Sequence, residues 1–143
     1  MKKFRKVVLV IVYKLENSEI SYLLLKRKLH WIGWESVKGG IEKGESKIQA
    51  VKRELKEETN LKAEKIVDMK IRNRFFYPKY FHGWPGYVGM EYKIFAVKVS
   101  GKVRFDRIEH SGFRWMNFKQ AYAKLTFKEQ KDDLKKVNER LNS

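Results

Sequence analysis

The sequence predicts a single α/β domain in which helices cover both faces of a mixed β-sheet. Its 143 residues, 43% of them hydrophobic, are enough to bury one complete core. Runs rich in β-branched and aromatic residues alternate with segments whose apolar residues recur at helical spacing. No linker, repeat or low-complexity tract divides the chain. We therefore expect one domain that spans residues 1–143.

The first half of the chain predicts two strands followed by a helix. The strands are expected at residues 7–14 and 20–27, and a loop is expected at residues 30–34. A glycine-rich turn then leads into a helix over residues 46–59. Ser46 is the expected N-cap of that helix, because its side chain can accept a hydrogen bond from a free backbone N–H of the first turn.

The second half predicts further strands and two helical segments. Strands are expected at residues 66–76 and 87–99, with a final short strand at residues 113–116. Asn117 opens a helical region, and a longer helix is expected from about residue 127 to residue 141. The apolar residues at helical spacing in this last helix are Leu134, Val137 and Leu141. Strands mixed with two main helices predict a sheet covered on both faces.

The N-terminal sequence and the absence of cysteine bear on where the protein works. The basic start MKKFRK and the apolar run at residues 7–12 could suggest a signal peptide. However, the run is too short to span a membrane and no small-residue cleavage site follows, so a buried strand is predicted instead. Zero cysteines exclude disulfides, thiolate metal sites and a cysteine nucleophile. We expect a cytoplasmic protein that does not enter a membrane.

The most informative stretch is a cluster of carboxylates on the first predicted helix. At 3.6 residues per turn, Glu54, Glu57 and Glu58 fall within an arc of about 100°. Carboxylates this close repel one another unless a cation lies between them, and oxygen ligands suit a hard divalent metal. The adjoining apolar stripe, expected to bury, consists of Ile48, Val51 and Leu55. A solvated face of a Lys/Glu-rich helix is the commoner meaning of such charges, but the preceding glycine-rich turn favours a metal site.

The turn and the helix together resemble the sequence signature of the Nudix hydrolases. That signature reads Gly, five residues, Glu, seven residues, Arg-Glu-aliphatic-any-Glu-Glu-any-Gly-aliphatic. The positions that match it in register are Gly39, Glu45, Arg53, Glu54, Leu55, Glu57, Glu58 and Leu61. The one departure is Asn60, where the family usually has glycine. Because asparagine tolerates the left-handed conformation of a helix cap, we expect the helix to end there all the same.

The resemblance implies a Nudix-type α/β/α sandwich and a metal-dependent hydrolase of phosphoanhydride bonds. It implies that Glu54, Glu57 and Glu58 hold one or more Mg²⁺ ions, or Mn²⁺ as an alternative, and that one of the three can serve as the base. Arg53 is expected to orient a carboxylate or the loop through its fork of donors. No Ser-His-Asp arrangement stands out, so a covalent intermediate is not expected.

The loop before the helix resembles a branch of the family that contains asymmetrical diadenosine tetraphosphate hydrolases and RNA 5′-pyrophosphohydrolases. Residues 37–45 look like the Pro-Lys-Gly loop of that branch, with valine in place of the proline. Lys38 would then face substrate phosphates. The backbone of Gly39 and Gly40 is expected close to metal or phosphate, because glycine allows close approach of the main chain. Glu45 is expected to hold the loop by hydrogen bonds rather than to bind metal.

Two stretches later in the chain are similar to the same branch. Residues 109–115 look like the segment that supplies a carboxylate outside the signature, so Glu109 is a candidate for a metal-binding or water-orienting role. Lys128 opens the last helix as in that branch, where it could meet a phosphate. Tyr77 lies in a turn that resembles one of the same branch. The aromatic residues that could either stack on a base or pack in loops and core are Tyr77, Tyr80, Phe81, Trp84 and Tyr87.

The remaining candidates carry weaker signals. Glu91 could supply a carboxylate from a central strand or could simply face solvent. The histidines His30, His82 and His110 show no ligand spacing with one another. Of the three, His110 is the strongest candidate, because it is next to Glu109.

The leading hypothesis is an enzyme that splits dinucleoside tetraphosphates asymmetrically, into ATP plus AMP for the diadenosine compound. One alternative removes pyrophosphate from 5′-triphosphorylated RNA or opens a nucleotide-capped 5′ end, and another removes pyrophosphate from free nucleoside triphosphates. A non-catalytic nucleotide- or RNA-binding module would predict a damaged carboxylate set, whereas the three glutamates are all present. The net charge of +16 favours binding of polyphosphates and of RNA. It does not decide between them, because the basic residues are spread along the chain and are not gathered in one RNA-binding motif. Base preference and the choice between monomer and homodimer stay open.

Overall fold

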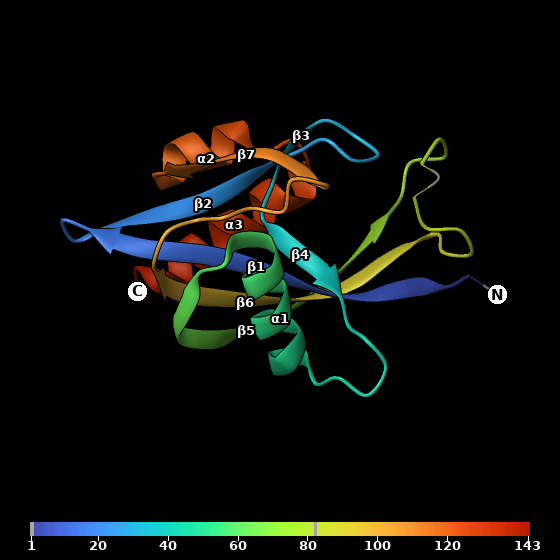
Figure 1. The fold of residues 1–143 in the computed structure, drawn as a ribbon, viewed down its shortest axis with the longest axis horizontal. Helices are drawn as coiled ribbons and strands as arrows, with labels where there is room; N and C mark the ends of the chain where they lie inside the picture. Colours follow the sequence, from blue (N-terminus) through green and yellow to red (C-terminus); the bar gives the residue numbers. More distant parts are fainter. Residues whose placement is uncertain (1, 82) are drawn as a thin grey trace.

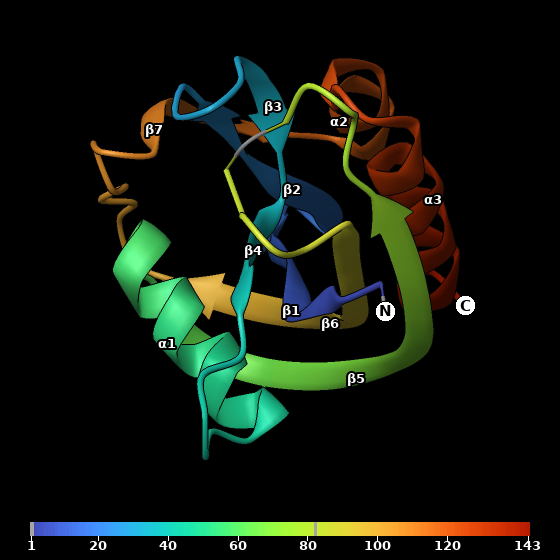
Figure 2. The same ribbon diagram turned by 90° about the vertical axis from the view of Figure 1, so that its right-hand side faces the viewer.

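The computed structural model describes residues 2–81 and 83–143 and has the predicted α/β architecture, a mixed sheet with helices on both faces (Figures 1 and 2). Figure 2 shows α1 on one side of the strands and α2 and α3 on the other. The strands are β1 (Phe4–Glu16), β2 (Glu19–Arg27), β3 (Gly33–Glu35), β4 (Val37–Gly40), β5 (Lys62–Phe76), β6 (Gly89–Ser100) and β7 (His110–Met116). The helices are α1 (Lys47–Thr59), α2 (Phe118–Lys124) and α3 (Lys128–Leu141).

Strand β1 lies at the centre of the sheet and determines its mixed character. The main order is β3-β2-β1-β6-β5, with β4 paired to β1 and β7 paired to β2. β1 runs parallel to β6 and antiparallel to β2 and β4. In the pairing with β4, Val8 lies opposite Gly39 and Leu9 lies opposite Lys38. The glycine-containing segment is thereby fixed beside the middle of the sheet.

Alternate side chains of β1 supply two separate cores. Val7, Leu9 and Ile11 belong to the core that α2 and α3 cover, which also contains Leu134. The alternate residues Val8, Val10 and Val12 belong to the core that α1 covers. Because successive side chains of a strand point to opposite faces, this continuous apolar run is what a strand buried on both faces requires. The interpretation of residues 7–12 as a buried strand is confirmed.

The ends of α1 are fixed by the predicted caps. The Ser46 side chain accepts a hydrogen bond from the backbone N–H of Gln49, and the Gln49 side chain accepts one from the backbone N–H of Ser46. At the other end, Asn60 adopts the left-handed conformation, with φ of 58° and ψ of 18°. Asparagine therefore replaces the expected glycine without loss of the cap.

The predicted apolar stripe of α1 is wrong at one position. Val51 and Leu55 are buried, but Ile48 is 40% exposed, and Ala50 takes its place in the core. Ile48 lies in the first turn of the helix, and helical spacing alone did not show that this turn leaves its side chain exposed.

Two short strands occupy segments that were predicted as loop and turn. β3 pairs with β2, and β4 pairs with β1, so Lys38, Gly39 and Gly40 form a strand rather than a turn. Neither strand has the run of β-branched residues that predicts one, because each is held by its neighbour and not by its own propensity. The other predicted strands are present: β1, β2, β5 and β7 extend further than expected, whereas β6 begins two residues later and ends one residue later than predicted.

The C-terminal helices follow the prediction closely. The Asn117 side chain caps α2 by accepting a hydrogen bond from the backbone N–H of Gln120. In α3, Leu134 and Val137 are buried and Leu141 packs against the same core. Among the described helices, none has the length and apolar character needed to cross a membrane.

Candidate active site

The three glutamates of α1 do not share one environment. Glu54 and Glu58 are one turn apart and are buried, with 7% and 5% of their surface exposed. The Glu57 side chain lies at the rim of the helix face and is 57% exposed. The helix therefore directs two carboxylates inward and one outward, where the sequence predicted three carboxylates facing a cleft.

Arg53 connects this helix to the loop that precedes it. Its guanidinium donates hydrogen bonds to Glu45 Oε2 at 2.7 Å, to the Gly40 carbonyl at 2.7 Å and to Glu54 Oε1 at 2.7 Å. A longer hydrogen bond of 3.3 Å reaches Glu57 Oε2. The planar fork of arginine is suited to several partners at once, so Arg53 fixes both a buried carboxylate and the loop backbone.

Glu45 holds the loop, as expected. Its Oε1 accepts hydrogen bonds from the backbone N–H of Glu42 at 3.0 Å and from Arg53 Nη2 at 2.9 Å. The hydrogen bonds from Arg53 lower the pKa of the Glu45 carboxyl to about 2, so it is ionised at neutral pH.

Gly39 leaves room for the Glu54 carboxylate. A Cβ atom placed on Gly39 would overlap the Glu54 carboxyl group. The sequence predicted close approach of the Gly39 backbone to metal or phosphate, and the structure shows close approach to a carboxylate. At Gly40, the carbonyl is occupied by Arg53, and the Arg5 guanidinium lies where a side chain would project.

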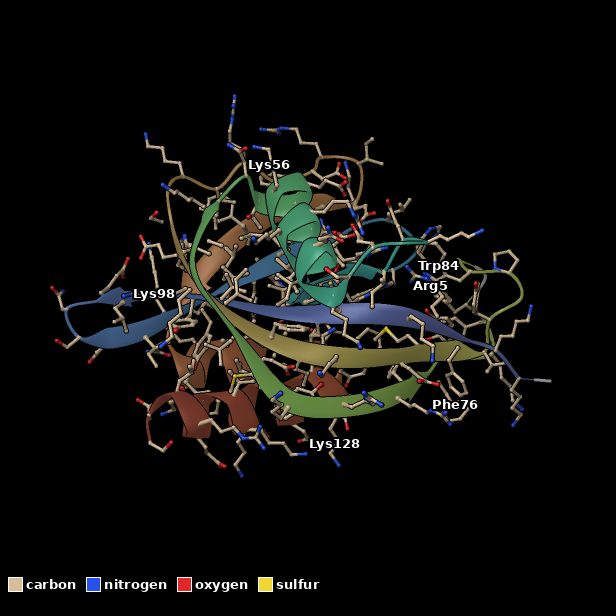
Figure 3. All side chains as sticks on the ribbon, turned by 90° about the horizontal axis from the view of Figure 1, so that it is seen from below. Arg5, Lys56, Phe76, Trp84, Lys98 and Lys128 are labelled. Carbon is tan, nitrogen blue, oxygen red and sulfur yellow. The ribbon has the colours of Figure 1, made fainter. Side chains whose placement is uncertain are left out.

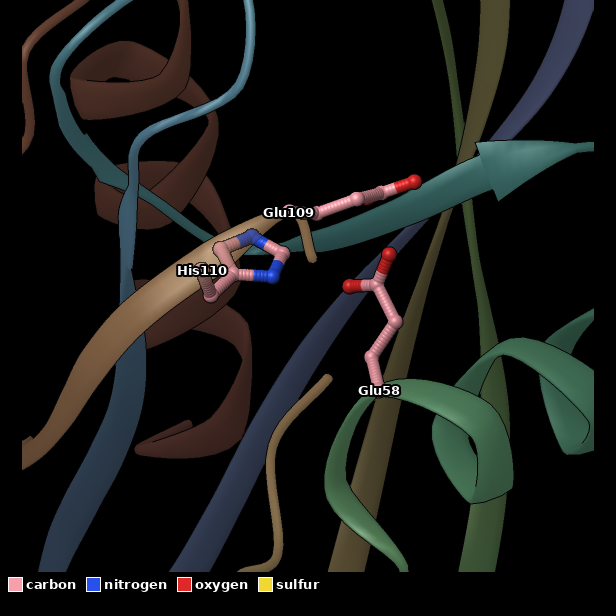
Figure 4. Close-up of side chains that lie close together, drawn as sticks. All are labelled: Glu58, Glu109 and His110. Carbon is pink, nitrogen blue, oxygen red and sulfur yellow. The ribbon is translucent and has the colours of Figure 1, made fainter. Parts of the chain in front are cut away.

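A second part of the site forms where the end of α1 meets the start of β7. Ligand atoms of Glu58, Glu109 and His110 lie within 4.8 Å of one another (Figure 4). His110 is fully buried, and the Glu109 side chain is 34% exposed. The Glu109 carbonyl accepts a hydrogen bond from the backbone N–H of Lys28 at 2.9 Å, which fixes this corner to the end of β2. The structure therefore places Glu109 beside the signature carboxylate Glu58, and its metal-binding or water-orienting role stays a prediction.

Glu35 is a site residue that sequence reasoning missed. It is 1% exposed, and its Oε2 lies 2.8 Å from His110 Nε2 and 3.2 Å from Arg27 Nη1. Its Oε1 lies 3.6 Å from the Lys38 ammonium. Burial alone would raise the pKa of Glu35, but Lys38, His110 and Arg27 together lower it to about 2. No spacing rule could reveal this group, because His110 is 75 residues away in the chain.

The inward carboxylates of α1 have the opposite electrostatics. Burial raises the pKa of Glu54 to about 7, although Arg53 opposes the change. Burial also raises the pKa of Glu58 well above its ordinary value, and the neighbouring charges of Glu35, Glu54 and Glu109 add to it. Ionisation of these buried carboxyl groups is costly without a counter-charge, but it becomes favourable once a bound cation neutralises them.

The donor set of the cluster fits a divalent metal. The carboxylates of Glu54, Glu58 and Glu109 supply oxygen ligands of the kind that Mg²⁺ and Mn²⁺ bind. In addition, Glu35 Oε1 and His110 Nδ1 are buried without a hydrogen-bond partner in the described part of the chain. The three carboxylates, with an unpaired buried nitrogen beside them, could therefore hold a metal ion.

A cavity of about 270 Å³ lies beside the cluster. Arg27 and Lys38 line it and also contact Glu35, so the cavity and the carboxylates share two basic residues. Its aromatic lining consists of Trp31, Phe75, Tyr77, Tyr80, Phe81, Trp84, Tyr92 and Phe127. Trp31 meets Phe127 edge to face, with ring centroids 4.8 Å apart, and the Tyr77 and Phe81 centroids are also 4.8 Å apart.

The cavity brings together most of the aromatic candidates. Of the five aromatic residues singled out from the sequence, all but Tyr87 line it. Trp31, Tyr92 and Phe127 were missed, because they lie outside the loop that carries the aromatic cluster in the sequence, and Phe75, at the start of that loop, was not singled out as a stacking residue. His30 also lines the cavity, whereas His82 lies outside the described residues.

Two further candidates lie apart from the cluster. Lys128 is exposed at the start of α3 and does not line the cavity, so its contact with a phosphate stays a prediction (Figure 3). Glu91 accepts hydrogen bonds from Lys6 and Arg74, each at 2.9 Å, and forms a surface ion-pair group.

Comparisons with known proteins identify the family. The NUDIX domain matches residues 3–137. The mouse bis(5′-nucleosyl)-tetraphosphatase (asymmetrical) is 27% identical over 139 residues, which cover 93% of this chain and 88% of that protein. An RNA pyrophosphohydrolase from Bradyrhizobium sp. is 35% identical over 83 residues, 55% of this chain and 49% of that protein. A crystal structure of a C. elegans Ap4A hydrolase complex shares the fold, with a TM-score of 0.78, 23% identity and coverage of 96% of this chain and 98% of that one. This chain therefore belongs to the Nudix family of hydrolases.

Proposed function

We propose that this Nudix pyrophosphohydrolase is metal-dependent and cleaves bis(5′-nucleosyl) tetraphosphates asymmetrically, into a nucleoside triphosphate and a nucleoside monophosphate. One observation carries the proposal: an aromatic cavity and a carboxylate cluster lie side by side and share Arg27 and Lys38. A dinucleoside polyphosphate has the complementary order of parts, a flat base joined to a row of phosphates. Stacking on aromatic side chains contributes about 1–3 kcal/mol per base.

The two basic residues suit the phosphates that would follow the base. The Lys38 side chain is 17% exposed and the Arg27 side chain 7%, so both charges are partly desolvated and attract phosphate more strongly than surface lysines do. Both are anchored by the ionised Glu35, which keeps them directed toward the boundary between cavity and cluster.

The residues that would hold a metal are Glu54, Glu58 and Glu109, with Glu57 at the rim. A divalent metal bound there supplies neutralisation of phosphate charge and a lower pKa for bound water. Arg53 holds the Glu54 carboxylate in place through Nη1. Glu109 is half-exposed at the edge of the cluster, where its carboxylate can orient the attacking water and accept its proton. Glu57 is the alternative base, since its carboxylate also reaches solvent.

RNA 5′ ends are the second candidate substrate, and a specific surface favours them. The Arg5 guanidinium stacks over the Trp84 ring at 3.5 Å from its centroid, and Figure 3 shows the two side chains together. Tyr80 and Phe76 nearby in the chain are 79% and 58% exposed. Exposed rings beside basic residues are typical of platforms for single-stranded nucleic acid, and the chain carries a net charge of +16.

Product analysis separates the candidates. We would supply the purified protein and Mg²⁺ with diadenosine tetraphosphate, 5′-triphosphorylated RNA and ATP at matched concentrations, and compare catalytic efficiencies. Preferential release of ATP plus AMP supports the dinucleotide proposal, whereas faster release of pyrophosphate from RNA or from ATP contradicts it. Glu58→Gln should abolish turnover, and Glu64→Gln, which changes an exposed carboxylate on β5, is the matched control.

A further inference from the structure

We propose that His110 is a metal ligand through Nδ1, held in position by Glu35, and that this nitrogen makes the site prefer transition-metal ions such as Mn²⁺ to Mg²⁺. The inference rests on the proposed metal dependence and adds a nitrogen donor from outside the Nudix signature. It also gives Glu35 a function, that of orienting the imidazole.

The first step concerns the unpaired nitrogen. His110 is fully buried, and its Nδ1 has no hydrogen-bond partner among the described residues. Figure 4 shows the ring beside the Glu58 carboxylate, with the Glu109 side chain on the same side of the cluster. A buried nitrogen that is left without a partner is costly, so such groups ordinarily face a ligand, a metal or a bound water.

The second step concerns the tautomer. Glu35 has Arg27 and Lys38 as cationic neighbours, so its carboxylate is an ionised acceptor for a proton carried on His110 Nε2, 2.8 Å away. With the proton on Nε2, the lone pair of a neutral imidazole lies on Nδ1 and points into the cluster. A carboxylate that accepts from one ring nitrogen while the other binds metal is a recurring arrangement in metalloproteins.

The third step concerns distance. Ligand atoms of Glu58, Glu109 and His110 lie within 4.8 Å of one another. Two ligand atoms of one ion are at most about 4.2–4.4 Å apart, because each lies about 2.1–2.2 Å from the metal. Three donor atoms at these separations lie at most about 2.8 Å from a common centre, about 0.6 Å more than a metal–ligand bond of about 2.2 Å, so side-chain movements of about that size would close the site around an ion.

A nitrogen donor changes which ion the site prefers. Mg²⁺ selects oxygen ligands and retains water, whereas imidazole favours first-row transition metals. A site with carboxylates alone would discriminate little between Mg²⁺ and Mn²⁺. A site that adds His110 Nδ1 is expected to bind Mn²⁺ more tightly than Mg²⁺, by about 10-fold or more.

Pulsed electron paramagnetic resonance on the Mn²⁺-loaded protein reads the ligand directly. We expect a nitrogen coupling that changes when histidine is labelled with ¹⁵N, that is lost in His110→Gln and that is kept in His30→Gln. Mn²⁺ that binds without nitrogen coupling overturns the inference while leaving metal dependence intact. Failure to bind either ion would overturn the inference and the proposed metal dependence together.

Calorimetric titration with Mn²⁺ and Mg²⁺ provides the second measurement. His110→Gln should weaken Mn²⁺ binding by about 10-fold or more and Mg²⁺ binding by less than about 3-fold. Glu35→Gln, which keeps the shape but removes the negative charge, should weaken Mn²⁺ binding to an intermediate extent. Equal losses for both ions would show that His110 is structural and would overturn the inference. If either variant fails to fold, the isotope-labelled wild-type spectrum still decides the question.

Discussion

Replacing Glu54 with glutamine should make the metal-free protein more stable at pH 8. Burial raises the pKa of Glu54 from 4.5 to about 7, because its charged form is poorly solvated. The folded state therefore holds a proton that the unfolded state releases between these values, and the contribution of Glu54 to stability is lost as the pH rises through 7. A carboxyl pKa raised by this amount corresponds to a loss of about 3 kcal/mol in the free energy of unfolding once the group is ionised. Glutamine avoids that cost and still presents an oxygen to Arg53.

The assay is urea denaturation of wild type and Glu54→Gln in EDTA at pH 8 and pH 5. We expect the variant to exceed the wild type by about 3 kcal/mol at pH 8 and by less than about 1 kcal/mol at pH 5, where the wild-type carboxyl is protonated. Glu57→Gln is the matched control, because its exposed carboxylate should give no gain. Saturating Mg²⁺ should reverse the order, since it stabilises only the protein that binds it. A variant that is no more stable than wild type at pH 8 in EDTA would refute this account of the buried carboxylate.

Other perturbations test the loop, the glycine and the cavity. Arg53→Lys should lower kcat at least about 10-fold and stability by about 1–3 kcal/mol, because one ammonium group cannot replace a guanidinium that binds both the loop and the helix. Steady-state kinetics and thermal melts measure the two effects. Gly39→Ala should displace the facing carboxylate and cost about 1–3 kcal/mol, whereas Gly112→Ala, which meets no atom within 4 Å, should be neutral in the same melts. Phe127→Ala should raise KM for a dinucleoside tetraphosphate by about 5- to 100-fold, with a smaller change in kcat. Phe113→Ala, which lies outside the cavity, should change neither constant. An unaltered KM for Phe127→Ala would argue against base stacking on this ring.

The parts of the fold that the sequence predicts well are those with local determinants. Helix α1 begins and ends where Ser46 and Asn60 place it, because each cap acts through its own backbone and near neighbours. β1 was recognisable because its continuous apolar run fills two cores. By contrast, β3 and β4 exist through pairing with distant strands, and their own residues carry no strand pattern.

The same distinction explains the prediction of the site. The carboxylates of α1 follow from helical spacing, but which of them are buried depends on the sheet beneath the helix. Glu109 was found through family resemblance alone. Glu35 and its contact with His110 could not be found, because residues so far apart in the chain meet only after β2, β3 and β7 have paired.

The pairing of β4 with β1 places the aromatic cavity and the Glu54 carboxylate on opposite faces of a single short strand. Lys38 lies opposite Leu9 and faces the aromatic cavity, while Gly39 lies opposite Val8 and faces Glu54. A slip of one residue in this register would exchange the faces, driving a lysine into the buried carboxylate and removing Lys38 from a cavity that Arg27 would still line. The pairing of four residues with the central strand thus keeps the cavity proposed to bind a base and the proposed metal ligand Glu54 on opposite sides of one backbone.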